Sequence, residues 1–164
     1  MSMTAPDDAP EVRKARGAFF TPPVIAAFIA NWAISSSSDM VLEPSMGDAE
    51  FLTHAVERLA DLGNGEPIVW GSELHAYSAE VGIERVTEAG GKAVVEVGDF
   101  FDRPVDQRFT VVIGNPPYIR FQDFSGRERA KAQSAALRGG VALSGLASAW
   151  AAFTVASSLH LARG

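Results

Sequence analysis

The sequence contains no cysteine among its 164 residues. This absence excludes a disulfide framework and any zinc or iron–sulfur site built on cysteine. Three scattered histidines do not favour a metal site either, so no metal is expected. No apolar run approaches the ~20 residues of a membrane span, and the polar start MSMTAPDDAP is unlike a signal peptide. We therefore expect a cytoplasmic protein that makes no contact with a membrane.

Basic side chains are scarce before residue 115. Residues 1–114 carry 8 basic and 18 acidic side chains, whereas residues 115–164 carry 6 basic and 2 acidic ones. The overall net charge of −6 argues against a stand-alone nucleic-acid binder. The basic end can still form a face that meets a polyanion, and a solvated helix face with extra arginines explains it equally well.

Apolar residues recur in a pattern that alternates between strands and helices. The composition, 47% hydrophobic and 21% charged, is that of one globular domain. After a flexible tail over residues 1–16, the pattern predicts helices at 22–34, 49–62, 75–87, 127–137 and 146–161. It predicts strands at 40–42, 67–71, 93–97 and 109–113. Helices between strands indicate βαβ units, so the expected fold class is α/β with a mainly parallel sheet.

Distinctive residues follow each predicted strand, at the edge where α/β sheets bind ligands. Gly47, after the first strand, lets the backbone approach a ligand closely. Glu73 lies 26 residues further on, where an acidic side chain can accept the hydroxyls of a ribose. Asp99 can accept a hydrogen bond from an adenine amino group, with Phe100 packed on the ring. Each residue alone also fits an ordinary turn or helix cap, but together they favour a nucleotide site.

The tetrapeptide Asn115–Pro116–Pro117–Tyr118 follows the fourth predicted strand. Its two prolines restrain the backbone, so the Asn115 side chain and the Pro116 carbonyl are presented rigidly. Both are acceptors that can receive the two hydrogens of a planar amino group and make its nitrogen a nucleophile. Tyr118 offers a flat face on which an extruded base can stack. The tetrapeptide therefore indicates a catalytic loop; a plain proline-rich turn is the alternative.

Three segments resemble motifs of the gamma-class S-adenosylmethionine-dependent adenine-N6 DNA methyltransferases of restriction–modification systems. These segments are GAFFTPP, VLEPSMGDAEFL and FTVVIGNPPYIR, which resemble motifs X, I and IV in that order. The piece LSGLASAWAAF resembles the helix that follows the catalytic loop. The resemblance implies a class I, Rossmann-like methyltransferase fold over residues 17–164.

The resemblance also implies a role for each matching residue. Asn115 and Pro116 would bind the target amino group, and Tyr118 would stack on a flipped adenine in double-stranded DNA. The remaining residues would bind S-adenosylmethionine: Phe20, Thr21, Glu43, Gly47, Glu73, Leu74, Asp99, Phe100 and Pro117. Among them, Glu43 would orient the methionine amino group.

The chain departs from the family pattern at two residues and in its extent. Ala49 stands where a second glycine is usual, and Met46 where a smaller side chain is usual. The resemblance stops after the fourth strand and its following helix, so we expect a partial catalytic domain without the target-recognition domain. The strand order three–two–one–four would leave strand four at an edge, which favours self-association or a partner chain.

Two other functions remain open from the sequence. NPPY-like loops also occur in enzymes that methylate protein glutamine or the guanine amino group of ribosomal RNA, because the planar amino group poses the same problem. The other alternative is a catalytically incomplete fragment that binds the cofactor.

Overall fold

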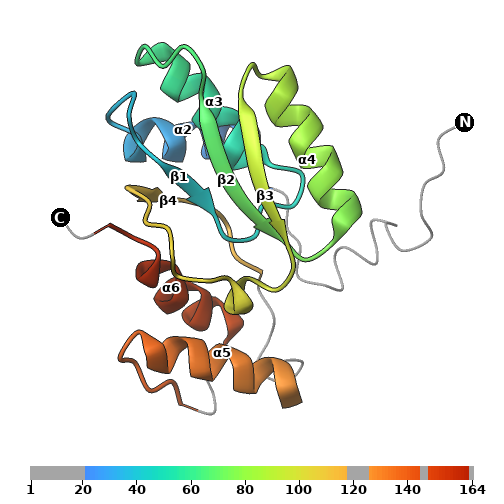
Figure 1. Cartoon of the computed structure of the whole chain (residues 1–164), viewed down its shortest axis with the longest axis vertical. Coiled ribbons are helices and arrows are strands. Elements are labelled where there is room, and N and C mark those ends of the chain that lie inside the picture. The colour runs from blue at the N-terminus through green and yellow to red at the C-terminus, as the bar shows by residue number, and fades with distance from the viewer. Residues whose placement is uncertain (1–20, 118–125, 145–147, 163–164) are drawn as a thin grey trace, which may run out of the picture.

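A parallel sheet of four strands forms the centre of the molecule, shown by the computed structural model in Figure 1. The structure describes residues 21–117, 126–144 and 148–162. The strand order is β3-β2-β1-β4. The strands are β1 (Val41–Glu43), β2 (Ile68–Glu73), β3 (Lys92–Val97) and β4 (Val111–Val112). This order and the parallel pairing confirm the predicted α/β fold.

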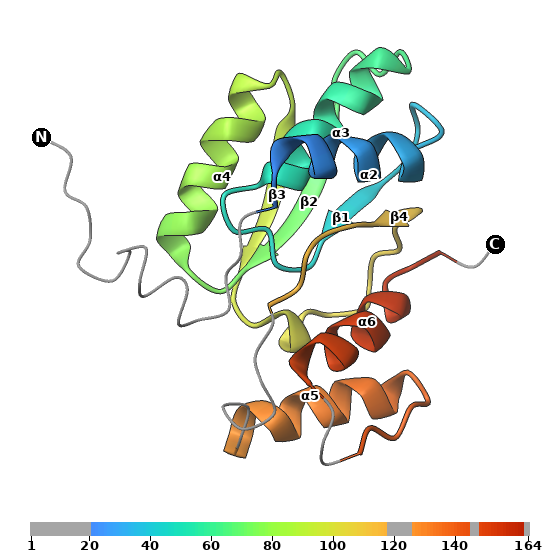
Figure 2. The same cartoon turned by 180° about the vertical axis from the view of Figure 1, so that it is seen from behind.

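Helices cover both faces of the sheet (Figures 1 and 2). One face carries α2 (Pro23–Ala33), α3 (Glu50–Asp61) and α4 (Ala76–Glu88). The other carries α5 (Gly126–Arg138), α6 (Ala149–Leu159) and the short 3-10 helix η2 (Phe100–Asp102). All five predicted helices are therefore confirmed, with ends within a few residues of the expected ones.

Two apolar clusters fill the space between the sheet and these helices. The first joins α2, α3 and α4 to the sheet through residues such as Ala30, Leu52 and Val69. The second joins α6, α5 and η2 to the opposite face around Leu42 and Phe109. The sheet thus holds one helical layer on each face.

Strand β4 is shorter than the predicted 109–113. Only Val111 and Val112 pair with β1, because Phe109 turns to the other side and forms a parallel bridge with Leu161. Its N–H donates to the carbonyl of His160 at 2.8 Å. Among the described residues β4 is the last strand in the order, as expected for strand four.

Thr21 does not cap α2, contrary to what its position suggests. The N-cap is Pro22, without a side-chain hydrogen bond, and Pro23 opens the helix. Proline tolerates the first turn, where its missing N–H would have no intrahelical partner. Thr21 is therefore left available for another contact.

Within the described residues, no helix combines the length and apolarity needed to cross a membrane.

Candidate active site

Glu43 ends the central strand β1 with its side chain buried in the protein. Only 3% of the residue is exposed, and Oε2 has no hydrogen-bond partner among the described residues. Burial raises the pKa of Glu43 well above its ordinary value, and the nearby charge of Asp48 raises the pKa further. A buried carboxyl with a free oxygen matches a ligand that brings a cation, because a cation would offset the cost of burying the charge.

Glu73 ties the ends of two neighbouring strands together. Its Oε2 accepts the N–H of Gly47 at 2.9 Å, and its Oε1 accepts the N–H of His75 at 3.0 Å. Each carboxylate oxygen keeps a second lone pair for a ligand. The predicted site residues Gly47 and Glu73 are therefore brought together, with Glu73 oriented by backbone on both sides.

The turn after β1 contains the two residues that depart from the family pattern. Ala49 has a φ of +63°, in the left-handed region that glycine adopts without strain. Met46 is buried over two glycines: a Cβ at Gly71 would lie 2.3 Å from its Sδ, and one at Gly82 2.4 Å from its Cε. The larger Met46 side chain is thus accommodated because its neighbours have none.

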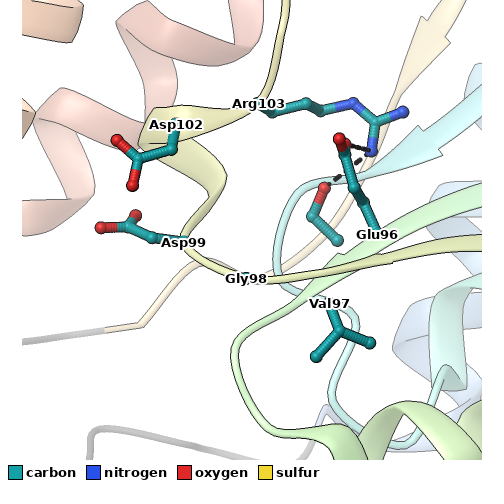
Figure 3. Close-up of a pocket in the computed structure, with 7 residues that line it drawn as sticks. Glu96, Val97, Gly98, Asp99, Asp102 and Arg103 are labelled. Atoms are coloured by element: carbon teal, nitrogen blue, oxygen red, sulfur yellow. Dashed lines mark hydrogen bonds and ion pairs between the residues drawn. The ribbon is translucent and has the colours of Figure 1, made fainter.

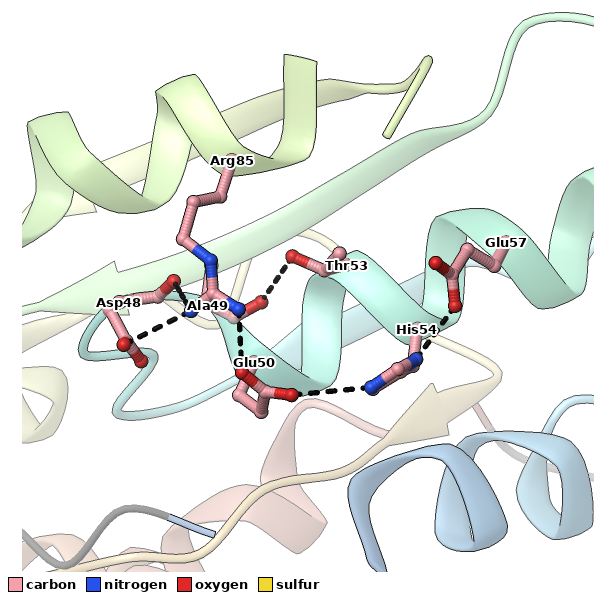
Figure 4. Close-up of polar contacts among 7 residues, drawn as sticks. All are labelled: Asp48, Ala49, Glu50, Thr53, His54, Glu57 and Arg85. Atoms are coloured by element: carbon pink, nitrogen blue, oxygen red, sulfur yellow. Dashed lines mark hydrogen bonds and ion pairs between the residues drawn. The ribbon is translucent and has the colours of Figure 1, made fainter. Parts of the chain in front are cut away.

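Arg85 of α4 holds this turn from outside, a contact that sequence reasoning missed (Figure 4). Its Nη1 lies 3.0 Å from the Asp48 carboxylate and donates to the Asp48 carbonyl at 2.8 Å. Its Nη2 lies 2.5 Å from Oε2 of Glu50, at the start of α3. One guanidinium therefore fixes the turn and the first residue of the following helix.

Asp99 lies where the chain leaves β3 and enters η2. Its Oδ1 accepts the N–H of Phe101 at 3.0 Å, which caps η2, and its Oδ2 accepts from Nζ of Lys131 at 3.0 Å. Leu74, which is also expected to bind the cofactor, is 61% exposed. A cavity of about 190 Å³ adjoins Asp99 on the η2 side, lined by Ser72, Glu96, Val97, Gly98, Asp99, Asp102 and Arg103 (Figure 3).

The Phe100 ring does not lie where the sequence interpretation placed it. The residue is only 4% exposed, and its ring stacks on Phe153 at a centroid distance of 5.6 Å. It therefore belongs to the second apolar cluster, because α6 offers it an aromatic partner. A cofactor contact at Phe100 is left to its backbone, while packing of its ring on an adenine does not agree with this structure.

Asn115 meets Thr21 across 94 residues of chain. Its Nδ2 donates to Oγ1 of Thr21 at 3.3 Å, so the residue that leads into α2 touches the loop at Asn115. Just before this loop, a Cβ at Gly114 would lie 3.3 Å from Cγ of Glu43. Glu43, expected at the methionine end of the cofactor, therefore lies next to the loop. Oδ1 of Asn115 remains available as an acceptor.

The loop is described only in part. Pro116 and Pro117 are half-buried beside Asn115. Tyr118, expected to stack on the target base, and Phe20, expected beside the cofactor, lie outside the described residues.

Comparison with known proteins agrees with this arrangement. The family model described as N-6 DNA Methylase matches residues 6–142. The type II methyltransferases M.PaeR7I of Pseudomonas aeruginosa and M.XhoI of Xanthomonas vasicola are each 30% identical to the chain. These matches cover 65% and 64% of the chain but only 24% and 25% of the relatives. The chain thus spans about a quarter of the length of these relatives.

Solved structures show the same fold at low sequence identity. The methyltransferase subunit of a type I restriction-modification system from Streptococcus thermophilus has a TM-score of 0.72 at 18% identity. That match covers 90% of this chain and 33% of the subunit. A putative class I S-adenosylmethionine-dependent methyltransferase from Listeria monocytogenes has a TM-score of 0.68 at 16% identity, covering 87% of this chain and 43% of that one. The fold is that of the class I methyltransferases, and the chain belongs to the N-6 DNA methylase family.

Proposed function

We propose that this chain is the S-adenosylmethionine-binding and catalytic part of a site-specific DNA methyltransferase that modifies the N6 amino group of adenine. The observation that carries the proposal is the convergence of Glu43, Glu73, Asp99 and Asn115 on the carboxyl edge of one sheet. Four independent segments supply these residues, and each offers the acceptor that one part of the reaction needs. Restriction–modification relatives support the same function.

The residues present fit S-adenosylmethionine. Its positive ammonium group matches the unpartnered, buried Oε2 of Glu43. Glu73 keeps lone pairs for the ribose hydroxyls, and the exposed Leu74 offers an apolar contact for the base. Asp99 would accept from the adenine amino group. When bound, the cofactor supplies an electrophilic methyl group.

The chain's contribution to methyl transfer is positioning and hydrogen bonding. Oδ1 of Asn115 and the carbonyl of Pro116 would accept the two hydrogens of the target amino group. These hydrogen bonds strengthen as the nitrogen becomes tetrahedral, so they favour the transition state over the ground state. Thr21 would orient the Asn115 amide, because its hydroxyl accepts from Nδ2. Pro117 would line the cofactor pocket, and Tyr118 would stack on the adenine.

The substrate we propose is double-stranded DNA from which one adenine is flipped. We also propose that the protein acts in the cytoplasm. Residues 17–164 would form part of the catalytic domain, and residues 1–16 a tail. For the edge of β4, the last strand of the sheet among the described residues, we propose self-association or a partner chain that adds a strand.

Calorimetric titration with S-adenosylmethionine tests the cofactor site. We expect binding that Glu73→Ala weakens by about 1–3 kcal/mol, because buried polar groups lose their partner. Glu80→Ala, an exposed glutamate on α4, is the matched control and should leave affinity unchanged. No binding at millimolar cofactor would refute the proposal.

A transfer assay with labelled cofactor tests the substrate. DNA, ribosomal RNA and a peptide release factor are offered in parallel, so that the alternatives compete directly. In a protein extended through the strands that the resemblance implies after residue 164, we expect label in DNA alone, lost in Asn115→Ala at nearly unchanged cofactor affinity. Residual activity within about tenfold of the unaltered chain would remove Asn115 from the catalytic role, since losing a transition-state hydrogen bond costs more.

A further inference from the structure

An excess of negative charge surrounds the exit of β3. Glu96, Asp99 and Asp102 all line the same small cavity, with Arg103 as the one base among the lining residues (Figure 3). Arg103 is already engaged, because its Nη1 lies 2.7 Å from Glu96 and 3.0 Å from Oγ of Ser72. A second cation, from α5, meets the two aspartates.

Lys131 of α5 is that cation. Its Nζ lies 3.0 Å from Oδ2 of Asp99 and also contacts Oδ2 of Asp102. Because the Phe101 N–H binds Oδ1, both oxygens of the Asp99 carboxylate are held. Lys131 and Asp99 are 29% and 28% exposed, so the pair lies at the rim of the site and not in bulk solvent.

We propose that Lys131 is a positioning residue for recognition of the cofactor's adenine. It acts through Asp99 and does not touch the cofactor. Without it, the Asp99 and Asp102 carboxylates would repel each other, and Asp99 would lose the contact that fixes Oδ2. With it, Asp99 is oriented and keeps acceptor capacity for the adenine amino group. The inference rests on the proposed cofactor site.

Arg138 provides a matched control on the same helix. It lies seven residues, or about two turns, beyond Lys131 and faces the same side of α5. Its Nη2 donates to the carbonyl of Phe101 at 3.0 Å, so it also ties α5 to η2, but through backbone and not through Asp99. Losing Arg138 therefore loosens the docking of α5 and leaves the Asp99 ion pair in place.

The test compares two ligands by calorimetry: S-adenosylhomocysteine, and its analogue with hydrogen in place of the 6-amino group. We expect Lys131→Met to weaken the binding of S-adenosylhomocysteine about 5- to 10-fold, which is the usual effect of losing one charged hydrogen-bond partner. The affinity for the analogue should change less than about twofold, because the analogue offers Asp99 no hydrogen-bond donor. Lys131→Arg should restore the preference for S-adenosylhomocysteine over the analogue. Arg138→Met should change the affinities for both ligands by the same factor. Lys131→Gln replaces the Met variant if thermal melting shows that the latter does not fold.

Four results would overturn the inference. Equal losses for both ligands in Lys131→Met, or the same discrimination in Arg138→Met, would reduce Lys131 to a docking contact. Tighter binding in Lys131→Met would show that it competes with the adenine for Asp99. If the unaltered chain binds both ligands equally well, Asp99 does not recognise the amino group, although the cofactor site stands. Failure of the unaltered chain to bind either ligand would instead refute the proposed function itself.

Discussion

At the scale of single residues, Glu43 couples the proposed cofactor site to protons. Burial raises its pKa, and so do the charges of Asp48 and Glu73, so in the empty site the neutral acid persists to a higher pH than in an ordinary glutamate. Binding an ammonium group favours the carboxylate and must release a proton. Affinity for S-adenosylmethionine should therefore rise with pH through the range in which Glu43 ionises in the empty site, which lies above the ordinary range of a glutamate, by up to about tenfold per unit. Calorimetry in two buffers of different ionisation enthalpy measures the proton released.

Glu43→Gln is the informative variant for this prediction. It keeps a neutral side chain of the same shape, so the thermal midpoint should stay the same or rise. Cofactor affinity should fall and lose its dependence on pH. A pH-independent affinity in the unaltered chain would show that Glu43 is already ionised in the empty site.

His160 makes the fold sensitive to acid. It is 3% exposed, its ring lies 5.2 Å from that of Phe100, and burial, with Arg103 and Arg108 nearby, lowers its pKa from 6.5 to about 4. Between these values the unfolded chain binds a proton that the folded chain does not. Stability is therefore fully present above pH 6.5 and declines as pH falls towards 4, by up to about 3 kcal/mol.

Urea denaturation across this pH range measures the effect. In His160→Gln the part of the stability loss between pH 6.5 and 4 that comes from the imidazole should disappear. His75→Gln, which leaves His160 in place, serves as the control for replacing a histidine by glutamine. Parallel profiles for all three proteins would contradict the assignment to His160.

At the scale of elements, the packing between β2 and the turn after β1 depends on a glycine and a methionine. Gly71→Ala would place Cβ 2.3 Å from Sδ of Met46 and 3.2 Å from Leu52, so we expect a loss of about 1–3 kcal/mol. Shortening the opposing side chain in Gly71→Ala/Met46→Val should recover part of this loss. The coupling in a double-mutant cycle should be about 0.5–3 kcal/mol.

Gly65→Ala is the matched control, because a Cβ there meets nothing within 4 Å. Denaturant titration of the single and double variants gives the free energies of unfolding. Additive losses at positions 46 and 71 would show that the two side chains do not share the same space.

Local sequence patterns predicted the elements well and their contacts poorly. The five helices and four strands follow from apolar periodicity, and the parallel order follows from helices placed between strands. Periodicity cannot show that Lys131 reaches Asp99, or that Asn115 reaches Thr21, because those pairs form only when separate elements pack. The same limit explains Phe100, whose aromatic partner on α6 lies 53 residues away in the sequence.

Helix α5, which lies in the basic part of the chain after residue 115, illustrates this limit. Its charge excess suggested either a polyanion-binding face or a solvated one. In the structure both side chains turn towards η2: Lys131 pairs with the Asp99 carboxylate, and Arg138 donates to the Phe101 carbonyl. Part of the positive charge of α5 is therefore explained by an intramolecular contact.

At the scale of the whole molecule, two surfaces favour association. The outer edge of β4 ends the described sheet, where only the Phe109–Leu161 bridge pairs beside it among the described residues. On the opposite helical layer, α2 exposes Val24, Phe28 and Trp32 along one ridge, with Trp32 80% exposed. Light scattering over a concentration series should show self-association of the chain.

Trp32→Glu separates these two surfaces. If the β4 edge drives association, the variant still associates; if the α2 ridge does, the variant becomes monomeric. A monomeric unaltered chain at high concentration, with a cooperative melt, would contradict the prediction for both surfaces.

The bridge between Phe109 and Leu161 has a consequence for hydrogen exchange. The Phe109 amide bonds to the carbonyl of His160, and the Ala162 amide bonds back to the carbonyl of Phe109, both at 2.8 Å. Neither bond can persist once the end of α6 separates from the strand, so both amides become exposed in one opening event. Phe109 and Ala162 should therefore exchange with deuterium at a common opening free energy, and that value reports how firmly the second helical layer is attached to the sheet.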